Sequence, residues 1–305
     1  MRIVFMGTPQ FAVTSLDALI KSGCDIVGVV TAPDKPSGRG QKVSHSAVKE
    51  YALANGLKVL QPEKLKSPEF LEELHALGAE LQVVVAFRML PEVVWSMPRL
   101  GTINLHASLL PQYRGAAPIN WVLINGEKES GVTTFFINED IDTGNLLFTE
   151  KVTLTGHETA GDLHDRLMNK GAGLLVKTVK AIESGRYSIN IQSALVNDEE
   201  LRHAPKLTKE LGNIDWNQST EAIYNLIRGL SPIPTAYTQL DGKTLKIYGA
   251  EQESIHQGIQ PGGFLTDNKT FLKFAATDGF IKVTDVQLEG KKRMDIGAFL
   301  RGNKM

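Results

Sequence analysis

The sequence predicts an α/β protein: a Rossmann-like, mostly parallel sheet with flanking helices, followed by a small antiparallel β-barrel of the OB type. In the first half, short runs of β-branched residues alternate with amphipathic stretches. After about Gly185 the pattern changes to short runs punctuated by Gly and Pro, which is typical of a small barrel. The length of 305 residues suits two domains, at roughly 150 residues for each.

The expected elements follow in order along the chain. The first strand is expected at residues 3–6, and Pro9 marks the start of a helix with an apolar stripe. A long helix should begin after Thr159, because Asp162 three residues on completes a capping box. The remaining strands are expected at residues 26–30, 82–87, 103–106, 132–137 and 146–152, and further helices near residues 118 and 221–230.

These patterns divide the chain into two domains and a linker. We expect residues 1–188 to form the first domain and residues 208–305 to form the C-terminal β-barrel. Residues 189–207 are assigned to the linker, because the stretch from Asn197 to Lys209 is polar, rich in charge and interrupted by Pro205.

Composition excludes several classes of protein. The balance of 33 Lys and Arg against 34 Asp and Glu gives a net charge of −1, which rules out a bulk polycation. The single cysteine, Cys24, cannot form an internal disulfide, which favours a reducing compartment. No apolar run approaches the ~20 residues that cross a bilayer. We therefore expect a soluble, cytoplasmic protein that does not associate with membranes. Separately, we expect it to be a monomer.

The densest chemical signal lies between residues 104 and 118. Asn104 and His106 stand two residues apart on an expected strand, so both side chains project from one face. They also lie at the carboxyl end of that strand, where open parallel sheets bind ligands. An amide can stabilise a developing oxyanion while an imidazole moves a proton, so the pair suits acyl-type transfer.

A second signal is the acidic loop at residues 138–144. A calcium loop is excluded, because its sixth position is Thr143 where Gly is needed and its twelfth is Thr149 where Glu is needed. Asp142 could instead reach His106, orient its ring and favour its charged form. The seven His residues show no metal-ligand spacing, so no metal is expected.

These motifs carry a resemblance to a known family. Asn104-x-His106 with Ser108-Leu109-Leu110-Pro111, followed by Asp142-x-Gly144, resembles the folate-dependent formyltransferases. Members of that family pass a formyl group from 10-formyltetrahydrofolate to an amine. The run from Tyr113 to Trp121 and the chain length resemble the members that act on methionine carried by initiator tRNA. The likeness covers essentially the whole chain.

The resemblance implies roles for individual residues. Asn104, His106 and Asp142 would be catalytic, and 10-formyltetrahydrofolate would bind as formyl donor near Ser108, Leu109, Leu110 and Pro111, without a metal. The sequence departs from the family at Ala86-Phe87-Arg88, where Ala-Tyr-Gly is common and borders the folate pocket.

Two basic regions would meet the partner that the resemblance implies, initiator methionyl-tRNA. Residues 33–42 contain two Pro and two Gly and are expected to form a loop without helix or strand, and its side chains Arg39 and Lys42 can contact phosphates. Arg39 matches the Arg that contacts the tRNA acceptor stem in the family. In the second domain, the basic candidates are the compact triplet Lys291, Lys292 and Arg293 and also Arg228, which ends an expected helix. From the sequence alone, the triplet fits a solvated hairpin as well as a contact with tRNA.

Four alternatives account for less of the sequence. A nicotinamide oxidoreductase needs a three-glycine spacing that Gly7-Thr8-Pro9 lacks. A non-enzymatic RNA-binding module leaves Asn104, His106 and Asp142 unexplained. A formyltransferase acting on a nucleotide-linked amino sugar has no acceptor stem to bind, so it would leave the basic loop at residues 36–40 unexplained. Purine-pathway formyltransferases have roughly one domain, so they would leave the second domain of this chain unexplained.

Overall fold

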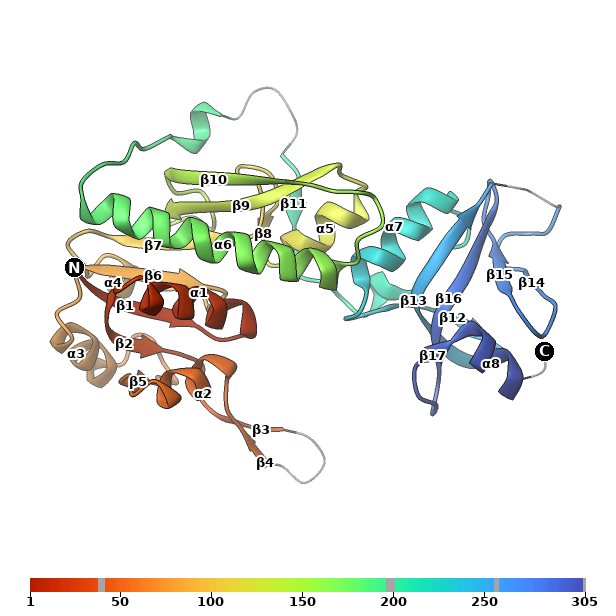
Figure 1. The fold of residues 1–305 in the computed structure, drawn as a ribbon, viewed down its shortest axis with the longest axis horizontal. Coiled ribbons are helices and arrows are strands. Elements are labelled where there is room, and N and C mark those ends of the chain that lie inside the picture. The colour runs from red at the N-terminus through yellow and green to blue at the C-terminus, as the bar shows by residue number, and fades with distance from the viewer. Residues whose placement is uncertain (38–41, 196–200, 255–257, 304–305) are drawn as a thin grey trace. The chain divides into compact units, whose positions relative to one another are not determined.

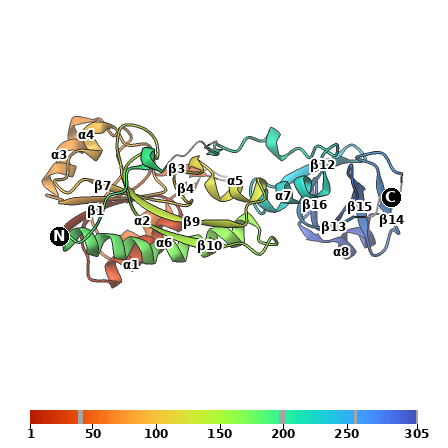
Figure 2. The same ribbon diagram turned by 90° about the horizontal axis from the view of Figure 1, so that it is seen from above.

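The computed structural model describes residues 1–37, 42–195, 201–254 and 258–303, which divide into two compact units (Figures 1 and 2). The first unit comprises Met1–Gly115, Ser130–Val152 and His164–His203. The second comprises Ala116–Glu129, Thr153–Leu163 and Ala204–Met305. Each unit is therefore assembled from segments that are far apart in the sequence.

The first unit is built on a seven-stranded sheet in the order β10-β9-β7-β6-β1-β2-β5. The strands β1, β2, β5, β6 and β7 run parallel, and β9 runs antiparallel to β7. This confirms the predicted mostly parallel sheet. The strand bounds are β1 (Arg2–Gly7), β2 (Asp25–Val30), β5 (Val59–Leu60), β6 (Leu81–Val85), β7 (Thr102–His106), β9 (Glu129–Phe136) and β10 (Leu146–Thr153).

Helices cover both faces of this sheet. Val84 and its neighbours pack against α3 and α4 on one face, and Leu105 meets Gly171 of α6 on the other. The capping box of α6 forms as predicted: the backbone N–H of Thr159 donates to Asp162, and that of Asp162 donates to the Thr159 hydroxyl. The helices are α1 (Gln10–Lys21), α2 (Ala47–Ala54), α3 (Pro68–Ala76), α4 (Glu92–Trp95) and α6 (Ala160–Glu183).

The basic segment at residues 33–42 differs from the prediction, because part of it is strand. β3 (Lys35–Ser37) pairs antiparallel with β4 (Lys42–Ser44) as a short hairpin. The expectation of a loop without strand is wrong, because two strands of three residues each can pair even when one of them contains Pro36. Proline is tolerated in such an edge strand, where its missing N–H removes no essential ladder bond.

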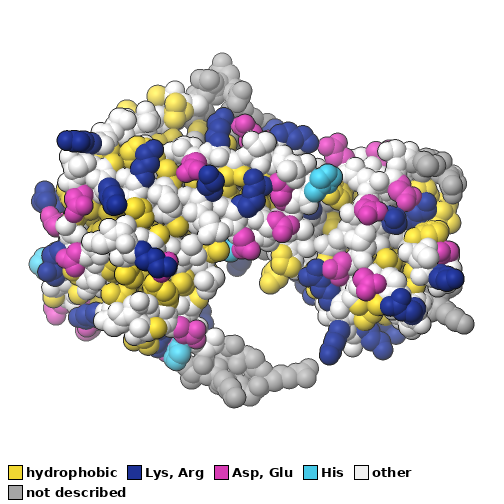
Figure 3. All heavy atoms as spheres, viewed as in Figure 1, with side chains coloured by type: hydrophobic (Ala, Val, Ile, Leu, Met, Phe, Trp, Pro, Cys, Tyr) yellow, Lys and Arg dark blue, Asp and Glu magenta, His cyan; other side chains and the backbone are white. Residues whose placement is uncertain are grey.

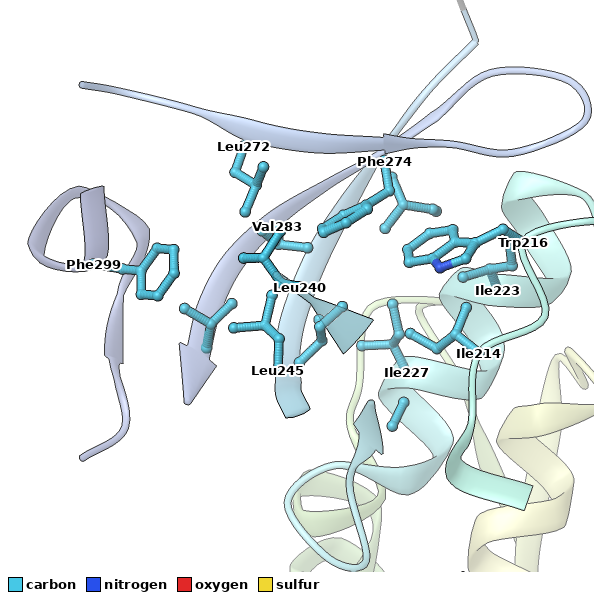
Figure 4. Packing of buried hydrophobic residues seen from close by; sticks show 14 of the residues in the cluster. Ile214, Trp216, Ile223, Ile227, Leu240, Leu245, Leu272, Phe274, Val283 and Phe299 are labelled. Atoms are coloured by element: carbon cyan, nitrogen blue, oxygen red, sulfur yellow. The ribbon is translucent and has the colours of Figure 1, made fainter. Parts of the chain in front are cut away.

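The second unit contains a curled six-stranded antiparallel sheet, which matches the predicted small barrel domain. Trp216 stacks on Phe274 inside it, with ring centroids 4.8 Å apart, among buried residues from α7 and the sheet (Figure 4). The elements are α5 (Pro118–Ile124), α7 (Thr220–Leu230), β12 (Ala236–Leu240), β13 (Lys243–Glu253), β14 (Phe264–Thr266), β15 (Leu272–Ala275), β16 (Phe280–Leu288), β17 (Met294–Asp295) and α8 (Ile296–Gly302).

Short elements complete the chain. β8 (Arg114–Gly115) and β11 (His203–Ala204) form a separate two-stranded sheet, and the single-turn 3₁₀ helices are η1 (Gln192–Ala194) and η2 (Glu210–Gly212). None of the helices in the described ranges is both long and apolar enough to span a membrane.

Candidate active site

The central strand β7 carries two of the candidate catalytic residues. Asn104 lies opposite Val84 of β6, and His106, the last residue of the strand, lies opposite Thr133 of β9. The alternation of a strand places Asn104 and His106 on the same face, away from α6. The Asn104 side chain is half-buried and has no hydrogen-bond partner within the described part of the chain, so its amide is available to a ligand.

The His106 ring is 7% exposed and is flanked on both of its nitrogens. Nε2 lies 2.9 Å from the carbonyl oxygen of Tyr113, and because a carbonyl can only accept, Nε2 carries the proton of that hydrogen bond. Nδ1 lies 3.8 Å from Oδ2 of Asp142. That separation is too long for a hydrogen bond, so Nδ1 is the nitrogen that can still exchange a proton.

Asp142 lies in the loop between β9 and β10, in a left-handed conformation with φ of 56°. Its Oδ2 also accepts a hydrogen bond of 3.0 Å from the backbone N–H of Gly115. Two residues on, Gly144 has no room for a side chain, because a Cβ there would lie 1.6 Å from the carbonyl oxygen of Phe136. The Asp-x-Gly spacing thus reflects a close approach of this loop to β9.

Two residues that support this site were not assigned a role from the sequence. Gln192 is 1% exposed, and its side chain binds both Arg114 and the Asp142 loop. Arg114 lies in the run from Tyr113 to Trp121 that resembles the family, and this run is the feature of the sequence that could have indicated a role for it. Gln192 lies in the segment predicted as linker, and a single glutamine between Ile191 and Ser193 gives no local signal.

The segment expected at the folate site forms a tight, buried turn after β7. Ser108 is fully buried, its hydroxyl donates to the carbonyl of Gln112, and its own carbonyl accepts from the Thr133 hydroxyl. Leu110 packs against Phe135 and Leu146. Leu109 and Pro111 are half-buried. The side chains of Ser108 and Leu110 therefore hold the turn in shape.

The divergent segment after β6 is held by Arg88. Its guanidinium donates to the carbonyls of Pro62 and Glu63, at 2.7 and 3.0 Å, and lies over the Phe87 ring. Burial lowers the pKa of Arg88 below its ordinary value. Ala86 begins this turn in a left-handed conformation, with φ of 48°.

The basic hairpin is anchored at its base by Asp34. Its carboxylate accepts hydrogen bonds from Gln61, Lys49 and His45, which hold the pKa of Asp34 well below its ordinary value. Arg39 lies outside the described residues, and so does the side chain of Lys42.

The second basic region contains side chains in different environments. Lys291 and Lys292 are exposed, whereas Arg293 is ion-paired with Asp285 and lies over the Tyr248 ring, 4.2 Å from its centroid. Figure 3 shows Lys and Arg side chains gathered at the lower edge of the second unit.

Arg228 is 4% exposed and donates to Asn225 and to the carbonyls of Glu158 and Leu123. It is therefore a structural residue and unavailable to an RNA surface, so its place among the basic candidates was wrong.

Among the described residues, no group of three His, Cys, Asp or Glu side chains could hold a metal ion.

Comparison with known proteins places this site in a family. Residues 1–179 match the family described as "Formyl transferase", and residues 206–304 match "Formyl transferase, C-terminal domain". The protein named "Methionyl-tRNA formyltransferase" of Parabacteroides distasonis is 53% identical over 311 residues, covering 100% of this chain and 96% of the relative. Its namesake in Flavobacterium johnsoniae is also 53% identical, covering 99% of this chain and 96% of the relative.

Solved structures agree on the fold. The N-formyltransferase of Helicobacter canadensis, in complex with folinic acid and dTDP-3-aminofucose, superposes with a TM-score of 0.67 at 21% identity, covering 94% of this chain and 98% of that one. HypX from Aquifex aeolicus, in complex with tetrahydrofolic acid, gives 0.67 at 17% identity, covering 98% and 47%. The sequence matches decide the family. The chain belongs to the formyl transferase family, in the group of the methionyl-tRNA formyltransferases.

Proposed function

We propose that the chain transfers the formyl group of 10-formyltetrahydrofolate to the α-amine of methionine on initiator methionyl-tRNA, for initiation of translation. One observation carries the proposal: a chain about half identical to methionyl-tRNA formyltransferases places His106 between Tyr113 and Asp142, with Asn104 on the same strand face. Residues 1–188 would hold the catalytic site, 189–207 would connect, and 208–305 would bind tRNA.

The proposed reaction balances without a further reactant. The methionine amine attacks the formyl carbon, and a C–N bond forms while the bond to N10 of the folate breaks. Asn104 donates a hydrogen bond to the oxyanion of the tetrahedral intermediate. The amine proton passes to Nδ1 of His106, the ring nitrogen without a hydrogen bond, and then to the departing N10.

Asp142 would act on the charge that this transfer creates. When Nδ1 takes up the proton, the imidazole becomes cationic, and a carboxylate 3.8 Å away stabilises that charge, because the side chains of His106 and Asp142 are both mostly buried. The carboxylate keeps its orientation through the hydrogen bond from Gly115. Asp142 therefore needs no large movement during the reaction.

The turn at residues 108–111 would border the folate, and the basic side chains would meet the RNA. We assign Ser108, Leu109, Leu110 and Pro111 to the folate site, and Arg39, Lys42, Lys291, Lys292 and Arg293 to tRNA contacts. A tRNA substrate and a folate donor are both handled in the cytoplasm, where we place the protein as a monomer.

The test is direct transfer of labelled formyl from 10-formyltetrahydrofolate to methionine-charged initiator tRNA, with free methionine in a parallel reaction. We expect transfer to the charged tRNA only. Asn104→Ala and His106→Ala should each lower the rate about 100-fold or more while the fold is retained. No transfer to charged tRNA by the wild-type chain, or equal transfer to free methionine, would contradict the proposal.

A further inference from the structure

We infer that Gln192 is a positioning residue for formyl transfer, because it fastens together the two chain segments that flank the ring nitrogens of His106. The inference rests on the proposed function, in which Asp142 and His106 act as a pair. Gln192 lies 50 residues from Asp142 and 78 from Arg114, so only the folded chain brings them together.

Every hydrogen-bonding site of the Gln192 amide is used. Its Nε2 donates to the carbonyl oxygens of Asp142 at 3.0 Å and Gly144 at 2.7 Å. Its Oε1 accepts from Nη2 and Nε of Arg114, at 2.8 and 3.2 Å. A primary amide offers two donors and two lone pairs, so a side chain that is 1% exposed is fully satisfied here.

The two segments that it joins meet opposite sides of the imidazole. Tyr113 accepts from Nε2 of His106, and Gly115 donates to the Asp142 carboxylate. Arg114, between them, is the residue that Gln192 binds. Asp142 itself faces Nδ1 of His106. A single amide thus fixes the spacing between the group at Nε2 and the group at Nδ1.

The Asp142 loop needs such a support. Asp142 has a positive φ, a conformation that costs energy for a residue with a side chain and persists only where its surroundings enforce it. The backbone beside Gln192 is itself fixed to β10, because Asn190 and Leu146 exchange two backbone hydrogen bonds, at 2.8 and 3.0 Å. The connecting segment therefore contributes to the order of the active site.

The test is a double-mutant cycle on the full-length chain. Gln192→Ala should lower kcat about 10- to 100-fold, because small misplacements of reacting groups are costly, while KM for both substrates changes little. In the Asp142→Asn background the same substitution should lower kcat by much less, since its effect passes through Asp142. An equal loss in both backgrounds overturns the inference.

Two further variants guard against loss of folding. Gln192→Glu keeps the acceptors for Arg114 but removes the donor to Asp142 and Gly144, and we expect a folded enzyme with reduced kcat. Gln82→Ala is the matched control: Gln82 of β6 is also 1% exposed, and its side chain accepts a hydrogen bond from the Thr102 hydroxyl of β7. It should lower Tm and leave kcat unchanged.

The outcomes separate the inference from the proposed function. Wild-type kcat in Gln192→Glu, or an equal kcat loss in Gln82→Ala and Gln192→Ala, would overturn the positioning role. Wild-type kcat in Asp142→Asn would instead contradict the proposed function of Asp142. Slow turnover in Asp142→Asn with no coupling to Gln192 would remove the inference alone.

Discussion

Oδ2 of Asp142 lies 3.8 Å from Nδ1 of His106 and accepts its hydrogen bond of 3.0 Å from the backbone of Gly115 instead. The carboxylate is therefore held by the main chain, and it lies near the imidazole without a hydrogen bond to Nδ1. Because the other ring nitrogen is committed to Tyr113, this arrangement leaves one nitrogen of His106 for a substrate proton.

Replacing the charge of Asp142 tests this arrangement. Asp142→Asn retains the shape and the acceptor for Gly115 but cannot stabilise a cationic imidazole. We expect kcat to fall about 100-fold, within the range for lost acid–base assistance, while Tm and the affinity for a folate analogue stay unchanged. Turnover near the wild-type value at saturating substrates would assign the stabilisation of His106 to another group.

The close packing of the Asp142 loop predicts a strong effect of a single methyl group. In Gly144→Ala the new Cβ would lie 1.6 Å from the carbonyl oxygen of Phe136, so the backbone must move. We expect a loss of about 2 kcal/mol or more in the free energy of unfolding, together with most of the activity. Gly173→Ala in α6, where a Cβ meets nothing within 4 Å, is the control. It should retain activity and gain slightly in stability; equal stabilities for the two variants would contradict the packing argument.

The features that could be predicted from the sequence are those with a local cause. The alternation along residues 103–106 placed Asn104 and His106 on one strand face, and the spacing of Thr159 and Asp162 indicated the start of α6. In both cases the interacting residues are within a few positions of each other, so periodicity and capping rules apply directly.

Features that depend on distant partners were missed or misassigned. Gln192 binds Asp142 and Arg114 across 50 and 78 residues, and nothing around it in the sequence indicates this. Arg228 was counted among surface cations, but the fold places it against carbonyls of Leu123 and Glu158. The hairpin β3–β4 was not predicted, because Pro36 and the two glycines favoured a loop. The pairing of Lys35–Ser37 with Lys42–Ser44 gives no signal in the sequence of either segment.

The basic hairpin gives a prediction on tRNA use. Arg39→Ala should sharply impair transfer when charged tRNA is varied at saturating formyl donor, because a guanidinium contacts phosphates and base edges through a fixed fork of donors. Folate binding and Tm should stay close to the wild-type values. Arg39→Lys should restore activity only in part, since it returns the charge without the fork. Unchanged kinetics for Arg39→Ala would remove the hairpin from the tRNA interface.

Glu158 predicts how stability depends on pH. Burial alone would raise the pKa of its carboxyl, but hydrogen bonds from the backbone of Thr155 and Gly156 outweigh burial and lower the pKa to about 2. Between that value and the ordinary pKa of a glutamate, the unfolded chain binds a proton that the folded chain does not. The contribution of Glu158 to stability is therefore complete above about pH 5 and declines as the pH falls.

Urea unfolding of the wild type and Glu158→Gln at a series of pH values measures this contribution. The wild type should be the more stable protein at pH 7, and the difference in the free energy of unfolding should shrink as the pH falls from about 5 toward 3. A difference that stays constant over this range would show that Glu158 does not keep its charge in the folded state.

The basic triplet of the second unit predicts that its members separate by role. Lys291 and Lys292 are exposed, and neither side chain is in an ion pair within the described part of the chain, whereas Arg293 is paired with Asp285 and stacked on Tyr248. Replacing Lys291 and Lys292 together by Ala should weaken tRNA binding without lowering Tm. The magnitude of the slope of log K against log salt should fall by about 2, one unit for each phosphate that the variant no longer neutralises.

Arg293→Ala should weaken tRNA binding and, in addition, lower Tm slightly, since an exposed ion pair is worth at most about 1 kcal/mol. Asp285→Asn is the matched control, because it breaks the same ion pair but leaves the three positive charges in place: it should reproduce the small decrease in Tm and retain tRNA affinity. A double Lys variant with wild-type affinity and salt dependence would exclude these two side chains from the tRNA surface.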